Sequence, residues 1–246
     1  MSMPQAQDFL DESKALHTLL APLGDADFGQ ATAFKGWTFD DVLRHLHYWN
    51  WMAWLQLNDE SVLVAQMGAI ARAGGMRPVE AAHVDDAGGQ ALLALWIAQA
   101  EATAKAYESA DPKARLKWVG PDMSARSSIT ARLMETWAHG QEIYDQLGVV
   151  RQNADRIRNI VVLGINTFGW TFKNRKLDMP ETMPQVVLTA PSGEMWTYGE
   201  AGGTDRIEGP AEEFCQVVTQ TRNVADTGLV VTGPIAAQWM GFAQCF

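Results

Sequence analysis

The spacing of the apolar residues changes about two thirds of the way along this chain, and that change constrains the fold more than any other feature. Before it, apolar positions recur at intervals of three and four residues, which is typical of helices that bury one face. Five helices are expected, over residues 4–21, 39–57, 90–109, from 127 or 128 to 148, and 155–173. The glycine-containing segment between the second and the third predicts a loop or a short additional helix. The first two thirds of the chain therefore belong to the mainly α class.

The last third of the chain shows strand spacing instead. Residues 186–189 and 195–198 are rich in β-branched and aromatic side chains and flank a Pro-Ser-Gly turn, which predicts a hairpin. A helix, a strand and a short final helix are expected further along, over 211–220, 227–232 and 235–242. We therefore expect a small α+β unit at the C-terminus. Prolines break the helical pattern just before it, which gives predicted domains of 1–178 and 179–246.

The composition excludes several classes of protein. Asp and Glu outnumber Lys and Arg by 29 to 19, and the resulting net charge of −10 would repel a phosphate backbone. No apolar stretch reaches the roughly 18 uncharged residues that a membrane span needs. The first residues mix acidic with apolar side chains, unlike a secretion signal. We expect a cytoplasmic protein that acts on a small molecule, with neither nucleic acid nor a membrane as partner, and a homodimer remains open.

Histidines offer the best candidates for chemistry, and they lie at positions 17, 45, 47, 83 and 139. His139 follows Glu135 by four residues on an expected helix, so both side chains face the same way. His45 shares a mostly apolar stripe of the second helix with Trp49, and a buried histidine needs a partner. Two bundle helices that supply one His and one Glu-x-x-x-His pair can build an inward-facing metal site. Taken alone, a Glu and a His four residues apart form a surface ion pair or a core hydrogen bond more often than a metal site.

The other histidines favour structural roles. His47 is two residues from His45 and therefore lies on nearly the opposite side of the helix, so the two do not easily bind one ion. His17 and His83 have no acidic or histidine neighbour at ligand spacing. We interpret both as structural or exposed.

Several reactive side chains are also explained by folding alone. Thr38 is placed to cap the second helix, and Asp41, three residues later, can return the hydrogen bond. Asp40 and Asp41 are thus expected at a helix start rather than on a metal. Cys215 lies on an amphipathic helix and is interpreted as a small core residue, and Cys245 has no base positioned beside it. Two cysteines cannot form a disulfide framework.

Two histidines and one carboxylate match the ligand set of catalytic zinc, with water or substrate in the fourth position. The same set is the facial triad of non-haem iron, and Fe2+ or Ni2+ therefore stays open beside Zn2+. Any of these ions would be an open Lewis acid that lowers the pKa of a bound water or thiol.

Two motifs resemble those of a known family. WTFDDVLRHL at residues 37–46 resembles the W-T-x-x-D-V-x-x-H-L segment of the DinB-like four-helix metalloproteins, and ETWAHG at residues 135–140 resembles their Glu-x-x-x-His segment. The whole chain is similar to the mycothiol-dependent maleylpyruvate isomerase group, in which a DinB-like antiparallel four-helix bundle precedes a small α+β domain. Residues 207–239 are similar to that second domain.

The resemblance implies roles for individual residues. His45, Glu135 and His139 would be the zinc ligands. Arg222 of the second domain would reach toward the mouth of the bundle and hold an anionic substrate or thiol. Trp49, one turn beyond His45, is expected to form a wall of the pocket. Beyond the water or thiol on the metal, the sequence does not identify a catalytic group.

The resemblance also implies a bacterial enzyme that activates a low-molecular-weight thiol, mycothiol or another, for addition to a small electrophilic acid. In the isomerase, addition to a cis enedioate permits rotation, and elimination of the thiol then leaves the trans product. Two alternatives remain. One is a hydrolase that uses a water on the same metal, and the other is a non-catalytic module that binds a metal or a small ligand.

Overall fold

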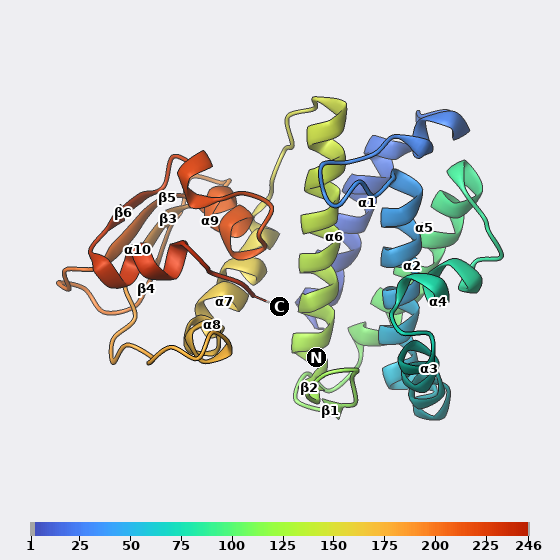
Figure 1. Ribbon diagram of the computed structural model, residues 1–246, viewed down its shortest axis with the longest axis horizontal. Helices are drawn as coiled ribbons and strands as arrows, with labels where there is room; N and C mark the ends of the chain where they lie inside the picture. The colour runs from blue at the N-terminus through green and yellow to red at the C-terminus, as the bar shows by residue number, and fades with distance from the viewer. Residues whose placement is uncertain (1–2, 246) are drawn as a thin grey trace. The chain divides into compact units, whose positions relative to one another are not determined.

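The computed structural model describes residues 3–245 and divides into two compact units, residues 1–150 and 151–246. In the first unit four long helices run alongside one another (Figure 1). They are α1 (Pro4–Leu20), α2 (Phe39–Asn58), α5 (Gly89–Glu108) and α6 (Ala125–Leu147). Because α1 and α2 each pack against both α5 and α6, the four close into a bundle. The predicted fold class, a mainly α bundle followed by an α+β unit, is confirmed.

Short elements connect the bundle helices. They are η1 (Asp25–Gly29), α3 (Glu60–Arg72), α4 (Arg77–His83), β1 (Arg115–Leu116) and β2 (Met123–Ser124). The segment predicted as a loop or one short helix thus forms two helices, α3 and α4, and both pack on α2. Pro78 lies in the first turn of α4, where its missing N–H costs no helical hydrogen bond.

Local signals in the sequence mark the ends of the two helices that carry the candidate site. The hydroxyl of Thr38 accepts the backbone N–H of Asp41 at 3.1 Å, and the Asp41 carboxylate accepts the N–H of Thr38 at 3.1 Å. The predicted capping box at the start of α2 is therefore confirmed. Helix α6 ends at Gly148, whose φ of 65° is the left-handed conformation expected of a glycine at that position. These local signals set the start of α2 and the end of α6.

The second unit combines a four-stranded sheet with helices. Its elements are η2 (Asp155–Ile157), α7 (Arg158–Asn166), α8 (Phe168–Asn174), β3 (Gln185–Thr189), β4 (Met195–Tyr198), β5 (Arg206–Pro210), α9 (Ala211–Val218), η3 (Val224–Asp226), β6 (Val230–Thr232) and α10 (Pro234–Met240). The strand order is β4-β3-β5-β6, and only the β3–β5 pair is parallel. Val186, Leu188, Trp196 and Ile207 are buried on one face, and α9 packs on β3 and β5 there. The predicted β3–β4 hairpin is confirmed.

Two expectations for this unit need correction. The single helix expected over 155–173 is divided, and the hydroxyl of Thr167 donates to the carbonyl of Leu163 at 3.0 Å where the helix breaks. Strand β5 was not expected, because its sequence, Arg-Ile-Glu-Gly-Pro, offers only one buried apolar residue and ends in two residues that strands disfavour. β5 is a strand because it pairs in parallel with β3, although its own sequence does not favour a strand.

The division between the units lies after residue 150, whereas the sequence pattern places it after residue 178. Packing within the second unit accounts for the difference. Gly164 of α7 lies so close to α9 that an added Cβ would come within 3.0 Å of Val218 Cγ1. Phe168 at the start of α8 meets Trp239 edge to face, with ring centroids 4.9 Å apart. Helices α7 and α8 are therefore part of the core of the second unit.

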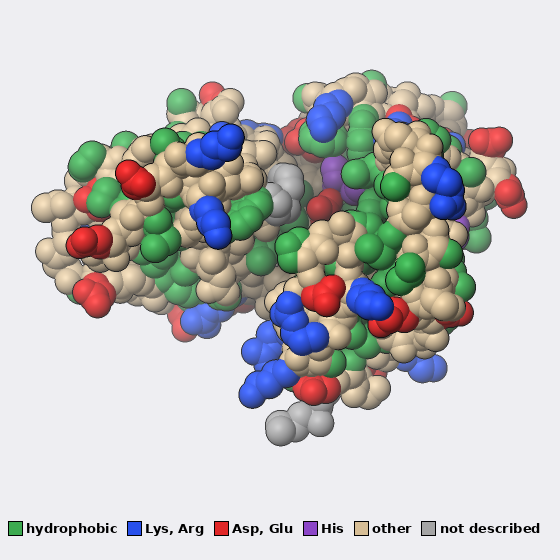
Figure 2. Space-filling model, turned by 60° about the horizontal axis from the view of Figure 1, so that its bottom comes forward, with side chains coloured by type: hydrophobic (Ala, Val, Ile, Leu, Met, Phe, Trp, Pro, Cys, Tyr) green, Lys and Arg blue, Asp and Glu red, His purple; other side chains and the backbone are tan. Residues whose placement is uncertain are grey.

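The surface agrees with the composition. On the face shown in Figure 2, acidic and basic side chains are interspersed with hydrophobic ones. Among the helices of residues 3–245, none is both long enough and apolar enough to cross a membrane.

Candidate metal centre

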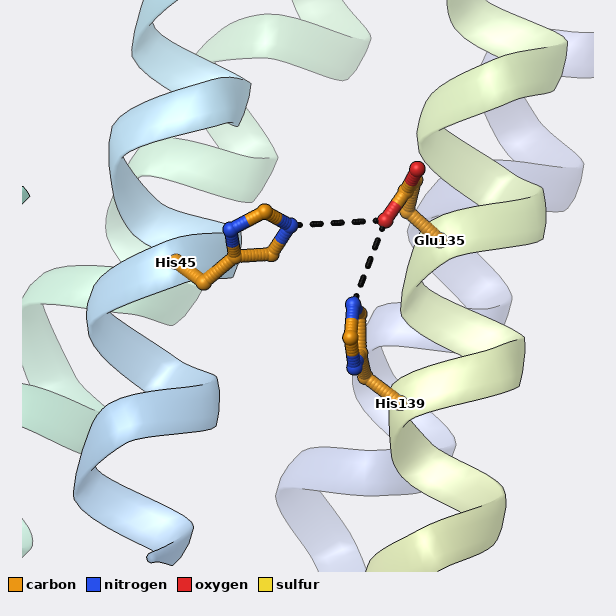
Figure 3. Close-up of side chains that lie close together, drawn as sticks. All are labelled: His45, Glu135 and His139. Carbon is orange, nitrogen blue, oxygen red and sulfur yellow. Dashed lines mark hydrogen bonds and ion pairs between the residues drawn. The ribbon is translucent and has the colours of Figure 1, made fainter. Parts of the chain in front are cut away.

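Helices α2 and α6 bring together the three predicted metal ligands inside the first unit (Figure 3). Glu135 and His139 project from α6 one helical turn apart, and His45 projects toward them from α2. The carboxylate Oε2 of Glu135 lies 3.4 Å from His45 Nε2 and 3.3 Å from His139 Nε2. One donor atom from each residue lies within 4.8 Å of the other two, and residues 3–245 contain no second such group of His, Cys, Asp and Glu side chains.

Burial and hydrogen bonding set the charge of each member. Burial acts to raise the pKa of Glu135, but hydrogen bonds to His139 and His45 and the charge of Arg132 hold it well below its usual value. Burial lowers the pKa of His139, which favours the neutral imidazole that binds metals. For His45 burial again acts to lower the pKa, but hydrogen bonds to Glu135 and Glu80 outweigh it and raise the pKa.

Glu80 of α4 is a member of the site that the sequence did not reveal. It is 1% exposed, and its Oε1 lies 2.8 Å from His45 Nδ1 and accepts the indole N–H of Trp49 at 2.9 Å. A carboxylate behind a histidine fixes which ring nitrogen carries the proton and directs the other nitrogen forward. The only local signal was a proline suited to the start of a short helix, which says nothing about where that helix packs.

The geometry of His45 tests whether these side chains fit a cation. Both of its nitrogens face carboxylate oxygens, Glu80 on one side and Glu135 on the other. A neutral imidazole has a single N–H and cannot donate to both. A second proton on the ring satisfies this need, in keeping with the raised pKa of His45, and a divalent cation between Nε2 and Glu135 would satisfy it as well. The donor separations of 3.3 and 3.4 Å also match the edge, about 3.3 Å, of a tetrahedron with zinc bonds of about 2.05 Å. The residues present therefore fit a divalent ion.

Aromatic rings cover the imidazoles. The ring of Trp37 stacks on His139 with centroids 5.5 Å apart and planes 8° apart, and it lies 5.3 Å from the ring of His45. Phe34 meets His139 edge on at 5.2 Å. The loop that carries both rings turns at Gly36, whose φ of 69° favours glycine, and rejoins α2 at its cap. These rings shield the donor atoms from water on one side.

A second wall of the site contains Trp49, Trp118 and Arg132. Trp49 was the predicted pocket wall, and its ring meets that of Trp118 at 5.4 Å. The guanidinium of Arg132 lies over the Trp118 ring at 5.8 Å, and its Nη2 lies 4.0 Å from Glu135 Oε1. Arg132 was not singled out from the sequence, because a lone Arg on a helix gives no sign of being buried.

Two further expectations concern His47, expected to be structural, and Arg222, expected to bind an anion. His47 is buried on another face of α2, where its ring lies 5.3 Å from that of His83. Burial lowers the pKa of His47 to about 4, and the charge of His83 adds to the shift. Arg222 lies in the second unit, where its Nη1 donates to the carbonyl of Thr221 at 2.7 Å and it lines a cavity of about 260 Å³. Its reach toward the bundle remains a prediction.

Relatives of the chain are known from sequence and from structure. A family model described as the mycothiol maleylpyruvate isomerase N-terminal domain matches residues 9–144. Two proteins from strains of Mycobacterium tuberculosis, both described as uncharacterized, are 34% identical over 250 residues, which covers 99% of this chain and 95% of each of them. A crystal structure of the mycothiol-dependent maleylpyruvate isomerase covers 93% of this chain and 91% of its own, with a TM-score of 0.58 at 15% identity. A mutant of that isomerase matches with a TM-score of 0.55 at 15% identity, over 87% of both chains. At this identity the two structures show a shared fold.

Proposed function

The chain belongs to the mycothiol maleylpyruvate isomerase N-terminal domain family, and from that premise we propose that it is a metal-dependent enzyme that uses a low-molecular-weight thiol. The proposed ligands are His45, Glu135 and His139, and the proposed ion is Zn2+. The observation that carries the proposal is the convergence of one donor atom from each of the three residues within 4.8 Å of the others, with Glu80 on the far nitrogen of His45.

When bound, a divalent cation with an open position supplies a Lewis acid that lowers the pKa of a thiol toward neutral pH. The residues of the chain prepare the site for it. Glu80 holds the Nδ1 proton of His45 and so orients the ring. Glu135 stays ionised, since its pKa is held well below the usual value. Trp37 and Phe34 cover His139 and limit the access of water.

The thiol and the substrate are proposed from the relatives. The solved neighbour is named for its dependence on mycothiol and for maleylpyruvate, and the two relatives in sequence are mycobacterial. We propose mycothiol as the thiol and a small acid with an activated double bond as the substrate. Addition of sulfur to that bond frees the carbon–carbon axis to rotate, and departure of the same sulfur restores the double bond and the thiol. Trp49 is proposed as a wall of the pocket and Arg222 as an anion-binding residue.

Metal analysis tests the ligand set. Protein purified without chelator is expected to carry about one zinc per chain, and His45→Ala and His139→Ala are expected to lose it. His47→Ala is the matched control, because His47 lies two residues from His45 on the same helix but faces His83. Full metal content in either ligand variant would contradict the proposal.

Thiol dependence tests the reaction. Isomerisation of maleylpyruvate, followed by its ultraviolet absorbance, is expected to require both zinc and mycothiol. Loss of activity on removal of the thiol alone supports the proposed reaction. Turnover of an ester or amide that is indifferent to thiol would instead indicate the hydrolase, with water as the nucleophile.

A further inference from the structure

Arg132 carries a buried positive charge that the surrounding protein compensates only in part. It is 5% exposed, and its Nη1 has no hydrogen-bond partner among residues 3–245. A guanidinium keeps its charge at any pH of interest, so it cannot escape the cost of burial by losing a proton. The nearest carboxylate oxygen, Glu135 Oε1, lies 4.0 Å from Nη2, the outer limit of an ion pair. Buried polar atoms without partners are uncommon in folded proteins.

Glu135 is also engaged elsewhere. Its other oxygen, Oε2, faces His45 and His139 at 3.4 and 3.3 Å. A divalent cation at this site and the guanidinium of Arg132 would together carry three positive charges. The carboxylates of Glu135 and Glu80 supply two negative charges. Before a thiolate or a substrate enters, one positive charge is therefore left over among these four groups. An anion is the partner that such a site lacks.

A series of contacts connects Arg132 to the candidate ligands. Its guanidinium lies over Trp118 at 5.8 Å, Trp118 meets Trp49 at 5.4 Å, and Trp49 donates to Glu80, which holds His45. The contacts therefore run without a break from Glu135 through Arg132 to His45. Because Arg132 Nη2 lies 4.0 Å from Glu135 Oε1, an acid held by Arg132 would lie close to the candidate ligands.

We propose that Arg132 binds a carboxylate group of the small acid that enters the site. This inference rests on the proposed function, whose substrate it positions. A guanidinium presents paired N–H groups that match the two oxygens of a carboxylate, and the face of Trp118 keeps the guanidinium plane in place. Arg132 is thus a binding residue for the substrate anion within the first unit, separate from the role proposed for Arg222.

The test measures binding of maleate, a small dicarboxylate, to zinc-loaded protein by isothermal titration calorimetry. Arg132→Met is expected to keep one zinc per chain and to weaken maleate binding at least about tenfold, the loss of one charge-assisted pair. Arg132→Lys keeps the charge without the paired geometry, so its dissociation constant for maleate is expected to lie between those of wild type and Arg132→Met. Arg126→Met is the matched control, because Arg126 is an exposed residue of the same helix and should leave the dissociation constant unchanged. Maleamide, the uncharged analogue, should not distinguish wild type from Arg132→Met.

Equal dissociation constants for maleate in wild type and Arg132→Met would overturn the inference. Joint loss of zinc and maleate in both Arg132 variants would also overturn it, because Arg132 would then act only by orienting Glu135. Circular dichroism checks that each variant is folded, and Arg132→Lys supplies the comparison if the Met variant is not. Metal analysis of the wild type reports separately on the proposed function. If the wild type binds no zinc, the metal-free proteins are compared instead. Weaker maleate binding by Arg132→Met than by wild type would then support the inference, and equal binding would overturn it.

Discussion

Two faces of helix α2 carry buried histidines two residues apart, and their surroundings are opposite in chemistry. On one face His45 is flanked by the carboxylates of Glu80 and Glu135. On the other face the ring of His47 lies beside His83, and its Nδ1 has no partner within residues 3–245. The consequences for protonation are opposite as well, since the pKa of His45 is raised and that of His47 is lowered to about 4.

The difference shows what separates a ligand from a core histidine. Both residues are 8% exposed, so burial alone does not distinguish them. Carboxylates do, because they orient the ring of His45, and Glu135 adds a third donor atom. The face of His45 is organised to hold a charge, whereas the face of His47 is organised to avoid one. Substitutions on either face, or at the start of the helix that both faces share, should therefore have different effects.

The largest effect is expected from removing the charge of Glu135, which would make the first face resemble the second. Glu135→Gln keeps the shape of the side chain but removes the anion beside Arg132. We expect zinc affinity to fall by at least about 100-fold and the metal-free protein to lose about 3 kcal/mol of stability, as when a buried ion pair loses one member. Zinc titration and urea unfolding measure the two effects. Glu142→Gln, on the same helix, controls for the loss of a carboxylate, and unchanged zinc affinity in Glu135→Gln would refute the assignment.

Low pH is expected to destabilise the protein through His47, on the second face of α2. His47 takes up a proton near pH 6.5 in the unfolded chain but only near pH 4 in the folded chain. The unfolded state therefore binds more protons between these two pH values. The free energy of unfolding should therefore fall as the pH falls through this window, by up to about 3 kcal/mol at about 1.4 kcal/mol per unit of pKa. His47→Leu should remove that share of the pH dependence, measured by urea unfolding from pH 7 to pH 4. Identical slopes for the variant and wild type would show that His47 is protonated alike in both states.

The part of this comparison that sequence could predict is the part set by local geometry. A spacing of four residues places Glu135 and His139 together, and a separation of two residues places His45 and His47 on different faces, wherever the helices pack. The capping box at Thr38 is equally local. The structure places the three predicted ligands together, and their role on a metal remains a prediction.

Glu80 and Arg132 could not be predicted, because their importance arises from packing. The short helix α4 carries Glu80 to His45 across 35 positions of sequence, and no periodic pattern records that contact. Arg132 looks like any polar residue of α6 until its burial against Trp118 is known. The domain boundary differs for the same reason, since tertiary contacts such as that of Gly164 with α9 assign α7 to the second unit.

A smaller effect on zinc affinity is expected at Glu80, which contacts His45 Nδ1 on the side of the ring away from Glu135 and His139. Glu80→Gln can still accept the Nδ1 proton of His45 but no longer carries a charge. We expect about a tenfold loss of zinc affinity for Gln and a loss nearer 100-fold for Glu80→Ala, which leaves the ring without support. Competition with a chromogenic zinc chelator measures both. Equal affinities for Gln, Ala and wild type would show that Glu80 serves only to hold α4 against α2.

The smallest effect is expected from a change that both faces share. Thr38 caps the helix that carries both histidines, and Thr38→Ala removes the hydroxyl that accepts the N–H of Asp41. We expect a loss of about 1 kcal/mol in the free energy of unfolding, with the zinc content and the pH dependence left as in wild type. Thr38→Ser keeps the acceptor and should recover most of the loss. A fall in zinc content with Thr38→Ala would mean that the start of α2 helps to place His45, and the two faces would then differ in their dependence on the helix as well as in their charge.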